Sequence, residues 1–226
     1  MTAIFLQVRL DSTRLPRKAL LELAGLSVVE HAMRSLNGVS ADVRVLLTTG
    51  DSAGELEMPA RSAGWEVFTG PKDDVLERFI LASRRYGVQR IVRATGDNPL
   101  VSASMAEAAL DLSRETLADY AGFGALPLGS GVEILDAAAL EEAYRDAEDP
   151  YEREHVAPFL YRHPERFRIV VPEAPESCRG PGMRLTLDTP EDYTFLAQLF
   201  DELYEGEPLD LDRVLPWLRQ RDGDAR

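Results

Sequence analysis

Residues 3–18 read Ala-Ile-Phe-Leu-Gln-Val-Arg-Leu-Asp-Ser-Thr-Arg-Leu-Pro-Arg-Lys, a short apolar run that leads into a polar segment. The run at 3–8 has the length and the apolar composition of a buried strand. The segment at 9–18 carries four cations and two hydroxyls, groups that suit the oxygens of a triphosphate. A solvated charged loop has the same composition, so this stretch alone leaves both interpretations open.

The alternation of strand and helix continues to about residue 119. Strands are predicted at 43–48, 65–68 and 90–95, and helices at 28–36, at 75–86 behind Asp73 or Asp74, and at 102–117. A further helix is predicted after the second strand, although Pro59 interrupts its pattern. This alternation predicts an α/β fold in which helices cover both faces of a mostly parallel, Rossmann-like nucleotide-binding sheet. We expect one three-layer domain over residues 1–226.

The pattern changes beyond residue 119. A Gly/Pro-rich loop at 122–131 leads to a predicted strand at 132–135 and to helices at 137–147 and 151–162. We interpret 122–162 as a small β/α excursion from the sheet. The rest of the chain predicts strands at 167–171 and 184–187, a helix from residue 190 and a short helix at 211–219.

Composition excludes several classes of function. The chain has 25 basic and 39 acidic residues, a net charge of −14 that would repel nucleic acid. The single cysteine, Cys178, excludes a disulfide framework and a cysteine-rich metal site. No stretch is long enough to span a membrane, and the N-terminus lacks the pattern of a signal peptide. We therefore expect a cytoplasmic protein with no nucleic-acid or membrane partner.

Carboxylates follow two of the predicted strands, where open α/β sheets bind their ligands. Asp97 follows strand 90–95 within Gly96-Asp97-Asn98-Pro99, and Asp188 follows the segment 184–187. Both suit Mg²⁺, which prefers oxygen ligands. Each also has a simpler interpretation, because Asp97 can shape a turn and Asp188 precedes an ordinary helix start at Thr189-Pro190.

Motifs along the chain decide between these interpretations. Ser12-Thr13-Arg14-Leu15-Pro16-Arg17-Lys18 resembles the Ser-Thr-Arg-Leu-Pro-x-Lys motif of the CMP-sugar synthetases, which include the CMP-Kdo and acylneuraminate cytidylyltransferases. Further motifs follow in the order seen in the spore coat polysaccharide biosynthesis protein F group of that superfamily, at 73–79, 93–100, 131–133, 153–156 and 187–192. The resemblance covers almost the whole chain.

The resemblance implies a GT-A type fold and a cytidylyltransferase that moves CMP from CTP to a sugar-like, acidic acceptor in surface polysaccharide biosynthesis, with release of pyrophosphate. It implies Mg²⁺ on Asp97 and Asp188, and a homodimer contact within 122–162, which would also face the acceptor. The residues that it implies are Lys18, Arg14 and Asp97 for catalysis; Gln7, Arg9, Ser12, Arg14, Lys18, Asp74, Arg78 and Thr95 for the nucleotide; and Glu133, Glu154 and His155 for the acceptor.

Alternatives remain for individual residues and for the function. Asp74 has the spacing of a helix cap with Glu77, and His155 suits an ordinary surface position. A glycosyltransferase that uses a nucleotide-sugar would share the fold and the metal. A non-catalytic nucleotide-binding subunit is the third alternative.

The phosphate motif has one informative spacing and two departures from the family pattern. Only three residues separate Arg14 from Lys18, which resembles cytidylyltransferases rather than sugar-1-phosphate nucleotidyltransferases and predicts a preference for cytosine. Asp11 and Arg17 stand where the family usually has glycine. We expect the Asp11 carboxylate to point away from the triphosphate or to pair with a cation such as Arg9, Arg14 or Arg17.

Overall fold

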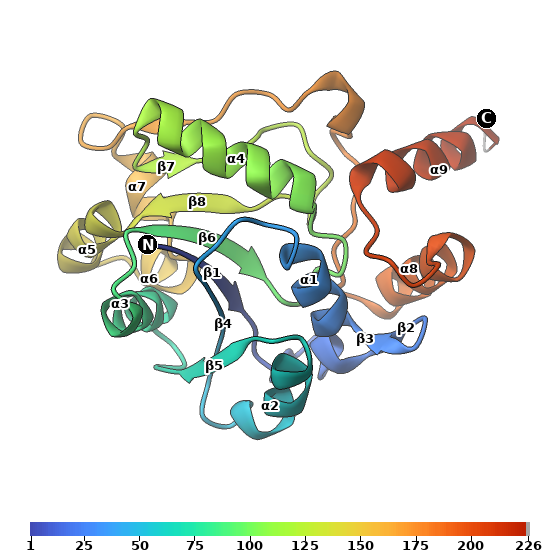
Figure 1. Ribbon diagram of the computed structural model, residues 1–226, viewed down its shortest axis with the longest axis horizontal. Helices are drawn as coiled ribbons and strands as arrows, with labels where there is room; N and C mark the ends of the chain where they lie inside the picture. Colours follow the sequence, from blue (N-terminus) through green and yellow to red (C-terminus); the bar gives the residue numbers. More distant parts are fainter. Residues whose placement is uncertain (225–226) are drawn as a thin grey trace.

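The computed structural model describes residues 1–224, with side chains to Arg221. Its centre is a seven-stranded sheet of order β5-β4-β1-β6-β8-β7-β9. The first four of these strands are parallel, and Gln7 in β1 lies opposite Thr95 in β6. The carboxyl ends of the two central strands therefore open side by side at one edge of the sheet (Figure 1). These strands are β1 (Thr2–Gln7), β4 (Val43–Thr48), β5 (Glu66–Thr69) and β6 (Arg90–Thr95).

The other half of the sheet is mixed. β8 (Glu133–Asp136) runs antiparallel to β6, and β7 (Tyr120–Ala121) runs antiparallel to β8. β9 (Ile169–Val170) completes the edge, parallel to β7. The predicted single α/β domain with a mostly parallel sheet is therefore confirmed, with the reversal of strand direction located at β8.

Helices cover both faces of the sheet, as the alternation of the sequence predicts. The apolar sides of α1 (Val28–Leu36), α2 (Ala53–Ser62) and α4 (Ala103–Thr116) form one buried cluster with the strands. A second cluster lies on the opposite face, where Phe79 packs edge-on against Phe5 of β1. The helices of that face are α3 (Val75–Tyr86), α5 (Ala137–Asp146), α6 (Pro150–His155) and α7 (Pro158–Arg162).

The C-terminal helices form a third apolar cluster outside the sheet. α8 (Pro190–Leu203) and α9 (Leu211–Asp224) lie together beside a two-stranded hairpin (Figure 1). The hairpin, β2 (Glu22–Leu23) and β3 (Leu26–Ser27), falls in a region where the sequence predicted no strand. Two short 3₁₀ helices, η1 (Lys18–Leu20) and η2 (Glu176–Cys178), complete the fold. Of the helices described, none has the length and apolarity needed to cross a membrane.

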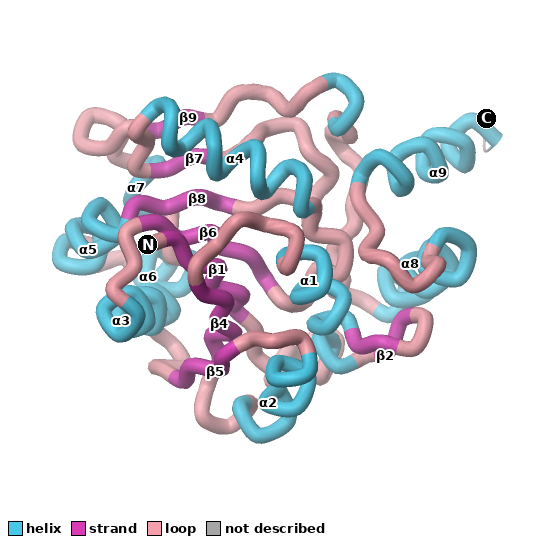
Figure 2. Tube along the Cα trace, viewed as in Figure 1, coloured by secondary structure: helices cyan, strands magenta, loops and turns pink. Residues whose placement is uncertain are grey.

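Two predicted elements are wrong. The helix expected at 151–162 is divided into α6 and α7 by a γ-turn, in which Val156 has φ 74° and ψ −60° and the Ala157 amide donates to the His155 carbonyl. Pro158 then starts the next helix, since proline has no amide to continue the first. The strand expected at 184–187 is a single bridge between Leu128 and Arg184, because the neighbouring chain is a loop (Figure 2).

Candidate active site

A cavity of about 370 Å³ opens at the carboxyl edge of β1 and β6. It brings together residues from the loop after β1, the turn after β6, the start of α3, the end of α6 and the segment before α8. Most of the predicted nucleotide and metal residues line it. The lining residues are Gln7, Val8, Arg9, Asp11, Ser12, Thr13, Arg14, Lys18, Val75, Arg78, Thr95, Asp97, Glu154, His155 and Asp188.

Backbone geometry turns Lys18 into this cavity. Arg17 has φ 56° and ψ 26°, a left-handed conformation that glycine adopts with least strain. The glycine that the resemblance implies at position 17 would adopt this geometry with less strain than arginine. The Arg17 side chain points away and pairs with Glu55, so the departure is accommodated outside the cavity.

Lys18 lies between the two carboxylates that were predicted to hold a metal. Its Nζ is 2.6 Å from Asp97 Oδ2 and 2.9 Å from Asp188 Oδ1, and it donates to the Leu187 carbonyl at 2.8 Å. Burial alone would lower the pKa of Lys18, but Asp97 and Asp188 hold that pKa above its usual value. Lys18 is therefore a fixed positive charge at the junction of the phosphate loop and both carboxylates.

Asp188 is surrounded by cations. Besides Lys18, Arg14 approaches Asp188 Oδ1 at 3.1 Å and Arg184 approaches Oδ2 at 3.5 Å. Burial would raise the pKa of Asp188, yet the hydrogen bond from Lys18 and the positive charges of Lys18, Arg14 and Arg184 hold it below the usual range. The carboxylate is therefore ionised at neutral pH and available to a cation.

Asp97 and Asp188 fit a Mg²⁺ site of the kind that nucleotides complete. Both carboxylates contact one atom, Lys18 Nζ, so both lie within reach of a common position. Residues 1–224 contain no cluster of three or more acidic, histidine or cysteine ligands for a metal. Mg²⁺ commonly binds through one or two carboxylates together with substrate phosphates and waters, so two suffice.

Asp11, the other departure from the family pattern, is paired. Its Oδ2 lies 2.7 Å from Lys72 Nζ and its Oδ1 lies 3.5 Å from Arg9 Nε. The hydrogen bond from Lys72 holds the pKa of Asp11 below its usual range, so the carboxylate is charged at neutral pH. The pairing with Arg9 is as predicted. Lys72 was not predicted, because it stands far along the chain in the loop before α3.

An Asp11→Asn variant is expected to bind CTP about three- to tenfold more tightly, the effect of roughly 1 kcal/mol that one exposed charge has. The carboxamide removes a negative charge from the cavity and frees Arg9, which lines it, for phosphate oxygens. Isothermal titration with CTP measures the change. Asp51→Asn is the matched control, since Asp51 also contacts Lys72, at 3.3 Å, but is not among the residues that line the cavity. Weaker CTP binding by Asp11→Asn would show that Asp11 orders the two cations for the nucleotide.

The two nucleotide residues predicted at the start of α3, Asp74 and Arg78, differ in their position relative to the cavity. Arg78 lines the cavity, but it is 2% exposed and its guanidinium donates to the carbonyls of Pro71 and Lys72, so it holds the Lys72 loop in place. Asp74 is not among the lining residues. It accepts from the Glu77 amide as the cap of α3 and pairs with Arg153 at 3.2 Å. The capping interpretation of Asp74 is thus confirmed.

The γ-turn at Val156 ends α6 where its last residues reach the cavity. Glu154 lies 3.9 Å from Arg9, and His155 packs on Tyr151 with 4.2 Å between ring centroids. Both residues line the same cavity as Arg9, Arg14 and Lys18, although the resemblance implied that they face the acceptor. A continuous helix through residue 162, as expected from the sequence, would have carried the chain on in another direction.

Glu133 lies in a second cavity of about 300 Å³, which shares Thr95 with the first. It pairs with Arg93 of β6 and accepts a hydrogen bond from the Tyr120 hydroxyl at 2.9 Å. Arg93 and Tyr120 were not predicted as site residues. A signal for Arg93 exists in the sequence, since it is a charge in the middle of the strand that ends at the site, between the apolar residues Val92 and Ala94.

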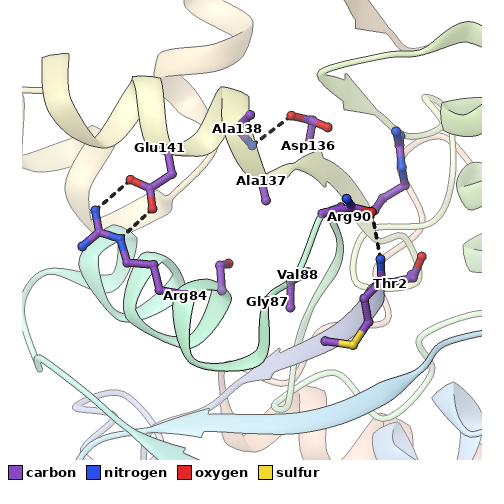
Figure 3. Close-up of a pocket in the computed structure, with 12 residues that line it drawn as sticks. Thr2, Arg84, Gly87, Val88, Arg90, Asp136, Ala137, Ala138 and Glu141 are labelled. Atoms are coloured by element: carbon purple, nitrogen blue, oxygen red, sulfur yellow. Dashed lines mark hydrogen bonds and ion pairs between the residues drawn. The ribbon is translucent and has the colours of Figure 1, made fainter.

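A cavity of about 780 Å³, larger than these two, is at the opposite edge of the sheet, between α3 and α5 (Figure 3). Its charged groups are engaged locally. Arg84 makes a bidentate pair with Glu141 at 2.7 and 2.8 Å, and Asp136 accepts the Ala138 amide at 2.9 Å. Ligands of open α/β sheets bind at the carboxyl ends of the strands, so size alone does not make this cavity the active site.

Comparison with known proteins agrees with this geometry. The sequence profile of the cytidylyltransferase family matches residues 3–214. The chain is similar to the spore coat polysaccharide biosynthesis protein SpsF of Bacillus subtilis, with 32% identity over 228 residues that cover 97% of this chain and 94% of SpsF.

Solved structures share the fold. A cytidylyltransferase from Leptospira borgpetersenii superposes with a TM-score of 0.89 and 26% identity, over 98% of this chain and 95% of that one. The CMP-2-keto-3-deoxy-manno-octonic acid synthetase complexed with CTP has a TM-score of 0.70 over 89% of this chain and 98% of that one, and at 15% identity it supports the fold alone. The chain therefore belongs to the cytidylyltransferase family of CTP-dependent nucleotidyltransferases.

Proposed function

We propose that this protein transfers CMP from CTP to a sugar-like acceptor, with release of pyrophosphate, in the synthesis of a surface polysaccharide. The observation that carries the proposal is the cavity that joins Arg9, Arg14 and Lys18 of one loop to Asp97 and Asp188. Three cations suit a triphosphate and two carboxylates suit its metal. Family membership supports CTP, and the similarity to SpsF supports the pathway.

The protein's own residues position and neutralise the reactants. Arg14 and Lys18 hold the β- and γ-phosphates and stabilise the charge of the departing pyrophosphate. Gln7 and Thr95, side by side at the strand ends, lie between this loop and the second cavity, where the acceptor would bind. Asp97 and Asp188 would hold Mg²⁺, which when bound supplies Lewis-acid polarisation of a phosphate oxygen. Such alignment of two substrates accounts for much of the catalysis in phosphoryl transfer.

The reaction is tested by measuring pyrophosphate release with CTP, UTP, ATP and GTP against a panel of sugars. CTP-dependent release that requires a sugar supports the proposal. Consumption of a nucleotide-sugar without use of CTP would identify a glycosyltransferase instead. Binding of CTP without turnover on any sugar would identify a nucleotide-binding subunit.

Nucleotide binding by itself should favour cytosine. A thermal-shift series with the four nucleoside triphosphates in Mg²⁺ is expected to give its largest shift with CTP, because at equal concentration the ligand that binds more tightly stabilises the folded state more. The three nucleotides other than CTP are the internal controls, since all four carry the same triphosphate. A larger shift with ATP or GTP contradicts the preference inferred from the Arg14–Lys18 spacing.

The segment 122–162, whose strand β8 belongs to the central sheet rather than to an excursion from it, is proposed to mediate a homodimer. Leu128 and Tyr151 in it are 54% and 46% exposed, an apolar surface that a second copy would cover. Light scattering at micromolar concentration is expected to give twice the mass of the chain. Tyr151→Glu should shift the protein towards the monomer, whereas a monomeric parent protein contradicts the proposal.

A further inference from the structure

The second cavity is lined by one cation and one anion, and their pairing bears on which acceptors it can bind. Its charged lining residues, Arg93 and Glu133, form a pair whose side chains are only 14% and 24% exposed. The Arg93 Nε also donates to Gln7 Oε1 at 3.0 Å, and the Tyr120 hydroxyl donates to Glu133 Oε1 at 2.9 Å. One positive and one negative charge thus neutralise each other within a continuous hydrogen-bonded chain, Gln7–Arg93–Glu133–Tyr120.

Arg93 and Glu133 in this hydrogen-bonded chain neutralise each other, so no charged ligand is needed to balance either of them. Both carboxylate oxygens of Glu133 have donors, one from Arg93 and one from Tyr120. Burial and the neighbouring Glu133 raise the pKa of Tyr120, so its hydroxyl stays protonated and keeps donating. A carboxylate brought into this cavity would add a net negative charge beside Glu133, with Arg93 already neutralised. In a partly desolvated site an uncompensated charge is strongly unfavourable.

The rest of the lining suits an uncharged ring. Phe123, Leu126 and Val132 contribute apolar surface, and glycines of the 122–131 loop also line the cavity. Small-molecule sites commonly combine apolar side chains with placed polar groups in this way. Thr95 belongs to both cavities, so a ligand here would lie next to the nucleotide site.

We propose that the second cavity binds an uncharged polyhydroxylated acceptor, a neutral sugar or sugar alcohol, and that Arg93 and Glu133 exclude the acidic sugars that the family resemblance implies. This inference rests on the proposed cytidylyltransfer. In the reaction an acceptor hydroxyl oxygen forms a bond to the α-phosphorus of CTP while the bond to pyrophosphate breaks. The hydroxyl proton leaves to solvent, and CMP-acceptor and pyrophosphate are the products.

The test compares neutral sugars and sugar alcohols with 3-deoxy-2-keto sugar acids and acylneuraminic acids at one saturating CTP concentration. Pyrophosphate release is measured for turnover, and calorimetry measures acceptor binding to the protein saturated with a non-hydrolysable CTP analogue. The unsubstituted protein is expected to use and bind neutral acceptors at least about tenfold better, the effect of one unfavourable charge interaction of about 1.4 kcal/mol.

Glu133→Gln makes the mechanism of exclusion testable. This substitution removes the carboxylate that neutralises Arg93. Turnover and binding of acidic acceptors, relative to neutral acceptors, should therefore rise about tenfold or more. The matched variant Arg93→Gln/Glu133→Gln removes both charges, so it has no unpaired cation and should not gain the preference for acidic acceptors that Glu133→Gln gains. The double variant also covers the case in which Glu133→Gln does not fold, which its thermal midpoint reports.

Each outcome of these measurements supports or overturns one part of the proposal. Preference for acidic acceptors by the unsubstituted protein, or acceptance of neither class in turnover and binding, overturns the inference about the cavity. An unchanged preference in Glu133→Gln overturns the role assigned to the charge pair. A protein that shows no thermal shift with CTP fails the proposed function itself, which separates that failure from a wrong acceptor class.

Discussion

An Asp97→Asn variant is expected to lose CMP transfer by at least about 10²–10³-fold, the loss typical of removing one group that stabilises charge in the transition state. The amide keeps the shape of the side chain but removes the charge that faces Lys18 Nζ at 2.6 Å and that would bind Mg²⁺. The fold should persist, because Lys18 keeps its contacts with Asp188 and with the Leu187 carbonyl. Pyrophosphate release at saturating CTP and Mg²⁺ measures the loss, and thermal unfolding checks the fold.

Asp111→Asn is the control for Asp97→Asn. Asp111 lies on α4 and makes only an exposed pair with Arg114 at 3.2 Å, so the same chemical change there should leave the rate unaltered. Normal turnover by Asp97→Asn would remove Asp97 from the catalytic site, and with it the assignment of the two-carboxylate metal site.

The Lys18→Met variant is expected to show two effects of opposite sign. Transfer should fall by about 10²–10³-fold, because a cation that stabilises the leaving pyrophosphate is lost. Binding of Mn²⁺ to the nucleotide-free protein should become tighter, because Lys18 Nζ is the cation that now neutralises both Asp97 and Asp188. Methionine retains the apolar stem of the 11% exposed side chain, so the packing around it changes little.

Electron paramagnetic resonance of free Mn²⁺ during titration, without CTP, measures the second effect independently of activity. Arg17→Met is the matched control, since it removes the neighbouring positive charge that pairs with Glu55 outside the cavity. Equal Mn²⁺ affinity of the unsubstituted protein and Lys18→Met would show that Lys18 does not compete with the metal. Tighter binding by Arg17→Met as well would point to net charge rather than to the Lys18 position.

Local sequence patterns were sufficient for the parallel half of the fold and for the core of the site. Strands β1, β4 and β6 and the helices between them follow from apolar periodicity, which depends only on near neighbours in the chain. The loop after β1 and Asp97 after β6 were then placed at one edge, since the carboxyl ends of parallel strands lie together.

Elements that depend on distant partners were not predictable in this way. Strands β2, β3 and β7 are two residues long and exist only through their pairing, so no periodicity identifies them. Conversely, 184–187 alternates like a strand, yet it finds one bridge because only a loop runs beside it. The break at Val156 needs a strained γ-turn that the packing of α6 and α7 maintains, and the sequence signal for it was Pro158 alone.

The sequence by itself determined which groups the site contains: the cations of residues 9–18, Asp97, and Asp188 ahead of its helix cap. Only the tertiary structure decided how they are paired. Lys18 meets Asp188 across 170 positions of the chain, and Asp11 meets Lys72 in addition to the predicted Arg9. Arg93 meets Glu133 across the antiparallel β6–β8 pair. Charge pairing depends on distance in space, and the register of strands and the turns of loops set that distance. Those contacts come from long-range packing, which residue types and their local spacing do not encode.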